Sequence, residues 1–165
     1  MILSLIELGS SCSSFAAIKA DYLIRNLLEN LLKKNQEGFI RSNNIKAAKA
    51  STRLEIFKRI STAKDWMDSQ YNTGISLEDI AVTASMNSQH FLRMFKQTFQ
   101  VTPHQYLIEL KLKKAKEFLE DTDLTIAGIC AQVGFESVFS FSLLFKNRFG
   151  FSPSHQRKSK LLHFR

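Results

Sequence analysis

A run of polar and basic side chains between residues 88 and 100 has the composition of a nucleic-acid contact. The run contains no acidic residue, so nothing in it repels phosphate. Arginine pairs well with guanine edges and glutamine with adenine edges, which makes Arg93 and Gln89 candidate base readers. Lys96 is expected to contact the phosphate backbone, while His90 either contacts a phosphate or packs as a surface histidine. The candidate DNA-binding residues of this run are Ser88, Gln89, His90, Leu92, Arg93 and Lys96.

Residues able to support catalysis or metal binding are scattered along the chain. Cys12 and Cys130 are too few and too far apart for a disulfide framework or a four-ligand zinc site. The four histidines have no ligand spacing with the cysteines or with one another, and Cys130 suits a small packing position. No phosphate-binding glycine loop, zinc-protease motif or nucleophile elbow occurs in the sequence. We therefore expect no enzymatic activity, no cofactor and no metal.

The overall charge points to a polyanionic partner. The 165 residues include 23 Lys+Arg and 15 Asp+Glu, for a net charge of +8, and the pI is about 9.6. A hydrophobic share of 44% and a charged share of 23% are ordinary for a globular domain. No apolar run reaches ~18 residues and the apolar start has no leading positive charge, so neither a membrane span nor a signal peptide is expected. The low cysteine count makes the reducing cytoplasm the expected compartment.

The elements that position these side chains are predicted to be helices throughout. Apolar residues recur at helical spacing and never alternate for long, so the predicted fold class is all-α. An N-terminal helix with a wide apolar stripe is expected to end at Lys34, and residues 35–44 to form a connection. A second helix is expected to begin at Asn44 or Ser51 and to end at Tyr71. Its predicted inner face consists of Leu54, Phe57, Ile60, Ala63, Trp66 and Met67.

Helix caps then follow one another closely. A capping box of Thr102 and Gln105 with Pro103 at the first helical position marks the clearest helix start in the chain. The other expected N-caps are Ser76, Asn87, Asp123 or Thr125, Ser137 and, for a brief last turn, Ser152. The predicted helices end near residues 83, 98, 120, 132 and 149.

Residues 75–105 and 125–155 form an internal repeat. Ile80, Ala81, Ser85 and Met86 match Ile129, Cys130, Gly134 and Phe135 at an offset of 49. From Phe91 and Phe141 onward the offset is 50, so the second copy carries one extra residue in its turn. Each copy is a short helix, a turn and a longer helix, which is the spacing of a helix-turn-helix unit. The phenylalanines expected in the core are Phe91, Phe95, Phe99, Phe141, Phe145 and Phe149.

The repeat resembles the DNA-binding domain of the AraC/XylS family of bacterial transcription regulators. The resemblance covers about residues 62–158 and rests on SLEDIAVTASMNSQHFLRMFKQTFQVTPHQYLIELKLKKAKEFL followed by AGICAQVGFESVFSFSLLFKNRFGFSPSHQR. It implies two helix-turn-helix subdomains joined by a connecting helix at about residues 103–120, with their recognition helices in successive major grooves. It also implies double-stranded DNA and RNA polymerase as partners, a role as an activator, and a cytoplasmic, nucleoid-associated location in bacteria.

The second recognition helix departs from the family's usual chemistry. Val138, Phe139 and Leu143 stand where many members carry polar residues and an arginine. We therefore expect specific recognition of DNA bases to concentrate in the first helix-turn-helix, with Phe139 contacting a thymine methyl or another protein. A protein-interaction module that retains the fold without reading DNA is the alternative function. The candidate DNA-binding residues here are Val138, Phe139, Ser140, Ser142, Leu143 and Lys146.

The expected domains are an N-terminal helical segment over residues 1–60 and the double helix-turn-helix domain over residues 61–160. The first segment is either the end of an upstream domain or a pairing region. Its stripe, within residues 20–34, either packs on the helix ending at Tyr71 or forms a homodimer interface. The basic run over residues 155–165 is either a solvated tail or a source of non-specific DNA affinity. The stripe consists of Tyr22, Leu23, Ile24, Leu27, Leu28, Leu31 and Leu32.

Overall fold

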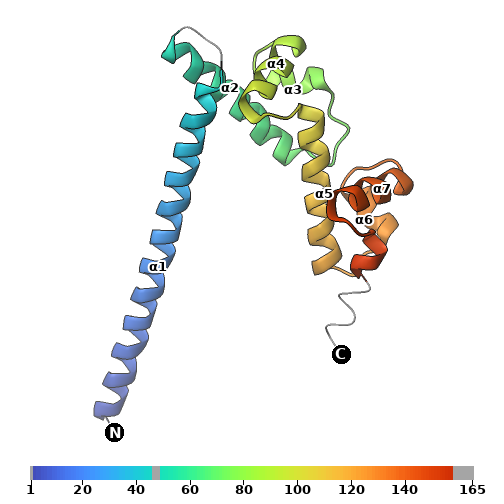
Figure 1. Ribbon diagram of the computed structural model, residues 1–165. Helices are drawn as coiled ribbons and strands as arrows, with labels where there is room; N and C mark the ends of the chain where they lie inside the picture. The colour runs from blue at the N-terminus through green and yellow to red at the C-terminus, as the bar shows by residue number, and fades with distance from the viewer. Residues whose placement is uncertain (1, 46–48, 158–165) are drawn as a thin grey trace. The chain divides into compact units, whose positions relative to one another are not determined.

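The structure is a computed structural model that describes residues 2–45 and 49–157, with side chains described at residue 19 and from residue 22 onward. Every regular element in these ranges is an α-helix (Figure 1). The chain divides into two compact units, Met1–Asn43 and Asn44–Arg165. The all-α prediction is confirmed, while the domain boundary expected near residue 60 stays a prediction. None of the described helices combines the length and the apolar character needed to cross a membrane.

The first unit is one helix, α1 (Ile2–Asn43), which continues through the connection predicted for residues 35–44. That prediction was wrong. A lone Gly38 does not end a helix, and the residues around it are compatible with continued helix. Across the predicted connection, Arg41 forms an i,i+4 ion pair with Glu37 at 3.2 Å. The large apolar side chains of the stripe are all more than half exposed.

In the second unit, α2 (Ala50–Ser69) packs on the first helix-turn-helix, α3 (Leu77–Thr83) and α4 (Ser88–Phe99). Its buried residues Ile60, Ala63 and Met67 come from the predicted inner face. The prediction was wrong for Leu54, which is 48% exposed because the core lies against the second half of α2. Phe91 and Phe95 are fully buried at the centre of this core, with ring centroids 5.5 Å apart.

The connecting helix α5 (Pro103–Asp121) leads to the second helix-turn-helix, α6 (Ile126–Gln132) and α7 (Val138–Phe149). Figure 1 shows α3 and α4 at one end of α5, with α6 and α7 along its other part. Phe141 and Phe145 fill the second core, and Cys130 is buried in it as expected. Phe99 and Phe149 are partly buried against the two cores. The phenylalanine face predicted from i, i+4, i+8 spacing is therefore confirmed.

The caps and the repeat are also confirmed. Capping boxes occur at Ser76 and Thr102, and Thr125 rather than Asp123 caps α6. The same turn hydrogen bond occurs in both copies: the Met86 N–H donates to the Ala81 carbonyl at 3.0 Å, and the Phe135 N–H donates to the Cys130 carbonyl at 2.9 Å. Asn87 and Ser137 cap the two recognition helices. The extra residue of the second copy thus lies between its turn and its N-cap.

Candidate nucleic-acid interface

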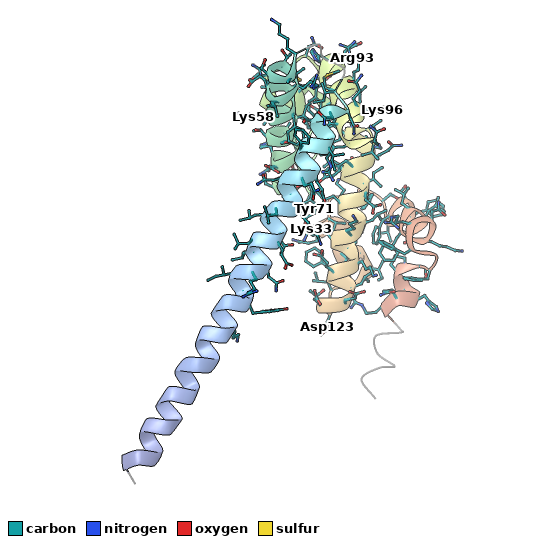
Figure 2. The ribbon with its side chains drawn as sticks, turned by 60° about the vertical axis from the view of Figure 1, so that its left-hand side comes forward. Lys33, Lys58, Tyr71, Arg93, Lys96 and Asp123 are labelled. Atoms are coloured by element: carbon teal, nitrogen blue, oxygen red, sulfur yellow. The ribbon has the colours of Figure 1, made fainter. Side chains whose placement is uncertain are left out.

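Helix α4 presents one buried face and one polar, exposed face. Asn87 begins the helix by accepting a hydrogen bond from the His90 N–H at 2.8 Å. Phe91, Met94, Phe95 and Thr98 then form the buried face. The exposed side chains are Gln89, Leu92, Arg93 and Lys96, and Ser88 at the helix start is half-buried. Burial of the phenylalanines therefore fixes which way the candidate base readers point, and Figure 2 shows Arg93 and Lys96 at the surface.

His90 lies one helical step away from this exposed face. It is half-buried and lines a groove together with residues from the first half of α2, including Glu55 and Arg59. Arg59 donates to Glu55 at 2.9 Å across one turn of α2. The structure thus separates His90 from the other candidates of α4, and its role in phosphate contact stays a prediction.

Helix α7 repeats the geometry of α4 with different chemistry. At the offset of 50, Gln89 is replaced by Phe139, Arg93 by Leu143 and Leu92 by Ser142, while Lys96 is matched by Lys146. Phe139 is 79% exposed and Leu143 is 50% exposed, whereas Ser142 is half-buried. Val138, Ser140 and Lys146 are exposed as well. The equivalent faces therefore share a lysine but differ at both positions of the candidate base readers.

Helix α5 fastens α7 through an ion pair that the sequence patterns did not reveal. Arg148 donates two hydrogen bonds to the carboxylate of Glu109, both at 2.7 Å. This bidentate arrangement lowers the pKa of Glu109, and Lys113 adds to it at 3.5 Å. The partners are 39 residues apart, so no local spacing indicates the pair. Both side chains are partly exposed, which limits what the pair adds to stability.

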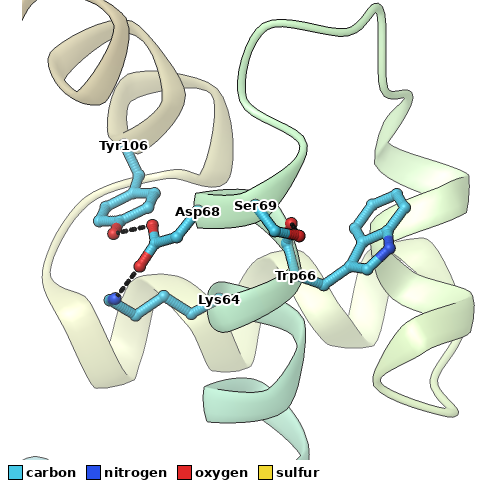
Figure 3. Close-up of polar contacts among 5 residues, drawn as sticks. All are labelled: Lys64, Trp66, Asp68, Ser69 and Tyr106. Carbon is cyan, nitrogen blue, oxygen red and sulfur yellow. Dashed lines mark hydrogen bonds and ion pairs between the residues drawn. The ribbon is translucent and has the colours of Figure 1, made fainter. Parts of the chain in front are cut away.

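A second cluster fastens α5 to α2 (Figure 3). The Tyr106 hydroxyl donates to one carboxylate oxygen of Asp68 at 2.5 Å, and Lys64 donates to the other at 2.6 Å. Burial, followed by the hydrogen bond to Asp68, raises the pKa of Tyr106. Burial alone would lower the pKa of Lys64, yet its hydrogen bonds with Asp68 and Tyr106 raise it overall. The i,i+4 spacing of Lys64 and Asp68 is the only sequence signal for this cluster.

The basic C-terminal run is only partly described. The Arg157 guanidinium donates to the Leu124 carbonyl at 2.8 Å, so it holds the last helical turn against the start of α6. Lys158, Lys160 and Arg165 lie outside the described residues. Within the described ranges, no group of three His, Cys, Asp or Glu side chains is placed to hold a metal ion.

Known proteins resemble the part of the chain that contains the two helix-turn-helix units. A family model described as a helix-turn-helix domain matches residues 72–159, more than half of the chain. The HTH-type transcriptional activator RhaS of Enterobacter sp. (strain 638) is 30% identical over 102 residues, which are 62% of this chain and 37% of that protein. The matches cover between 34% and 50% of the length of these curated relatives.

Solved structures share the fold, and two of them illustrate the match. One is a transcriptional regulator with an AraC-type DNA-binding domain from Chromobacterium violaceum, with a TM-score of 0.59 at 28% identity over 62% of this chain and 92% of that chain. The other is the DNA-binding domain of AdpA in complex with a target DNA, with a TM-score of 0.59 over 61% of this chain and 91% of that chain. At 24% identity the second match shows the fold alone. The chain belongs to the AraC/XylS family of transcription regulators, which are not enzymes.

Proposed function

We propose that the chain is a sequence-specific DNA-binding transcription regulator in which α4 enters a major groove of double-stranded DNA. The observation that carries the proposal is the exposed face of α4, where Gln89, Arg93 and Lys96 stand together opposite a buried phenylalanine face. Gln89 and Arg93 would read adenine and guanine edges, and Lys96 would contact a phosphate. Ser88, His90 and Leu92 complete the proposed contact.

The second recognition helix is proposed to enter the next major groove and to bind mainly through the backbone and DNA shape. Lys146 keeps the phosphate contact, while Phe139 and Leu143 offer only apolar surface toward the bases. Val138, Ser140 and Ser142 belong to the same proposed contact. The operator would then be sharply defined in one half only. Two equally sharp blocks about 10 bp apart in a selected-site logo would refute this asymmetry.

The direction of regulation is proposed from the relatives. RhaS is named as a transcriptional activator. We infer that this chain also activates transcription, with RNA polymerase as its protein partner, in the bacterial cytoplasm and associated with the nucleoid. Residues 61–160 would supply the DNA-binding part of this activity.

Pairing through α1 is proposed for the apolar stripe within residues 20–34. The large apolar side chains of the stripe, among them Leu27 and Leu28, are more than half exposed in a helix of 42 residues. A two-fold interface would bury the same patch from each subunit and bring two DNA-binding domains to one DNA segment. Burial against another part of the same protein is the competing arrangement, and sedimentation of the full chain distinguishes the two.

Affinity measured against salt concentration tests the proposed function. A DNA-binding regulator should prefer its selected site over unrelated DNA and lose affinity by about 0.9 log units per log unit of salt for each phosphate contacted. A protein-interaction module, which the exposed Phe139 and Leu143 favour, would show neither behaviour. Absence of both the site preference and the salt dependence would therefore overturn the proposal.

A further inference from the structure

The turns of the two helix-turn-helix units have the same backbone shape but different residues. Ser85 has a φ of +53° in the first turn and Gly134 a φ of +77° in the second. Since Ser85 adopts the left-handed region with a side chain, this conformation alone does not explain the glycine. Gly150 after α7 has a φ of +86°, and a Cβ added there would meet nothing within 4 Å. The surroundings of Gly134 must therefore differ from those of the other two positions.

The difference is a close approach by the backbone that follows α2. A Cβ added to Gly134 would lie 2.4 Å from the carbonyl oxygen of Asn72, 2.8 Å from its carbonyl carbon and 3.0 Å from its Cα. All three are backbone atoms, so no side-chain rotation can relieve the overlap. Only glycine lets the turn of the second helix-turn-helix lie against the segment that joins α2 to the first helix-turn-helix.

The connecting helix α5 also contacts Gly134, through a side-chain hydrogen bond. Lys111 of α5 donates a hydrogen bond to the Gly134 carbonyl at 2.7 Å, and its ammonium lies 5.5 Å from the centre of the Phe135 ring. Tyr71, next to Asn72, packs against the second hydrophobic core. The segment after α2, the middle of α5 and the turn between α6 and α7 thus meet at one glycine.

We propose that this contact, formed by the Asn72 backbone, Gly134 and Lys111, sets the position of α7 relative to α4 and makes Gly134 a positioning residue for DNA binding. The inference rests on the proposed function, because it assumes that both recognition helices engage one DNA segment. Successive major grooves on one face of DNA are ~34 Å apart, so both helices enter unbent DNA together only when their separation matches this repeat, and any other separation adds the cost of deforming the DNA. A separation that is fixed before binding also removes the entropic cost of ordering the two helices on DNA. The affinity for the whole site is therefore higher relative to the affinity for half of it.

Gly134→Ala and Gly150→Ala form the matched pair that tests the proposal. Both place alanine in the left-handed region, but only the first meets the Asn72 backbone. Each full-chain variant is titrated with a duplex carrying the whole selected site and with a short duplex carrying only the block read by α4. Gly134→Ala should lose about tenfold or more affinity for the whole site relative to Gly150→Ala, with equal affinities for the short duplex. Equal losses on both duplexes, or no loss, would overturn the proposal.

A distance measurement separates failure of this inference from failure of the proposed function. Spin labels are attached to Glu78→Cys in α3 and Asn147→Cys in α7, in a Cys12→Ser, Cys130→Ala background. They report the separation of the two helix-turn-helix units without DNA. The distance distribution should be narrow in the parent chain and in Gly150→Ala, and broader or shifted in Gly134→Ala. Unchanged distributions would overturn the inference, whereas loss of DNA binding with the expected distances would overturn only the proposed function.

Lys111→Met keeps the test decisive if Gly134→Ala does not fold. This variant retains most of the aliphatic stem but removes the hydrogen bond to the Gly134 carbonyl, with no change at a glycine. It should broaden the same distance distribution and lower the affinity for the whole site more than for the short duplex. A narrow distribution together with an unchanged ratio of the two affinities would overturn the proposal.

Discussion

Replacing Arg93 with alanine tests the proposed base readout at one position. The side chain is exposed on α4, and an exposed surface substitution changes stability by no more than about 0.5 kcal/mol. The variant should therefore unfold at nearly the same urea concentration as the parent chain. Any larger effect on DNA binding can then be attributed to a lost contact with DNA.

The expected loss follows from the geometry of an arginine on a guanine edge. A bidentate contact to the guanine O6 and N7 contributes about 1–3 kcal/mol of discrimination against other bases. At 1.4 kcal/mol per factor of ten, Arg93→Ala should weaken binding to the selected site by about 5- to 140-fold. Lys58→Ala is the control, because it also removes one exposed positive charge but from α2 (Figure 2).

Fluorescence anisotropy with a labelled duplex measures the DNA affinities of the parent chain, Arg93→Ala and Lys58→Ala at one fixed salt concentration. Titrations are repeated on duplexes that carry each of the three other base pairs at the position assigned to Arg93. The parent chain should discriminate among the four duplexes, and Arg93→Ala should bind all four almost equally. A variant that weakens equally on every duplex but keeps the parent's discrimination would place Arg93 on a phosphate instead.

The remaining predictions cover the backbone contact, two pH dependences and pairing. Lys96→Ala should weaken binding uniformly across sequences and reduce the salt slope by about one unit, and an unchanged slope would remove this lysine from the backbone. Tyr106→Phe should cost about 1–2 kcal/mol at neutral pH. Because the pKa of Tyr106 is raised in the folded chain, this difference should shrink as pH rises above about 10, which urea unfolding at several pH values checks. The pKa of Glu109 is lowered, so its ion pair should contribute above about pH 4.3 and be lost as pH falls further; Glu109→Gln should flatten that acid loss, and an unaltered acid limb in urea unfolding would refute it. Leu27→Glu with Leu31→Glu should give a folded monomer that binds a double site weakly and a single site almost normally, while a parent chain already monomeric at micromolar concentration would rule out pairing through α1.

The features predicted well from sequence are those determined within a few residues. The capping boxes at Ser76 and Thr102 join groups three residues apart, so the pattern and the structure agree. The phenylalanine faces follow from the helical period, and the period also separates them from the exposed Gln89 and Arg93. The repeat located the extra residue of the second turn because insertions accumulate in turns.

The features missed from sequence depend on contacts between distant parts of the chain. Tyr106 and Asp68 are 38 residues apart, and Lys111 and Gly134 are 23 apart, so neither pair has a local pattern. Gly134 has a positive φ, but its contact with the Asn72 backbone depends on how the two helix-turn-helix units pack. The predicted end of the N-terminal helix at Lys34 was wrong for a different reason, because one glycine and several polar residues do not end a helix.

Methylation interference on the selected site is the most direct test of whether α4 reads bases in the major groove. Guanine N7 lies in the major groove and adenine N3 in the minor groove, and each can be methylated before binding. Binding by the parent chain should be blocked by N7 methylation of one guanine in the sharply defined block. The same methylation should have little further effect on Arg93→Ala. Interference confined to adenine N3, or absent from the block, would contradict readout by α4 in the major groove.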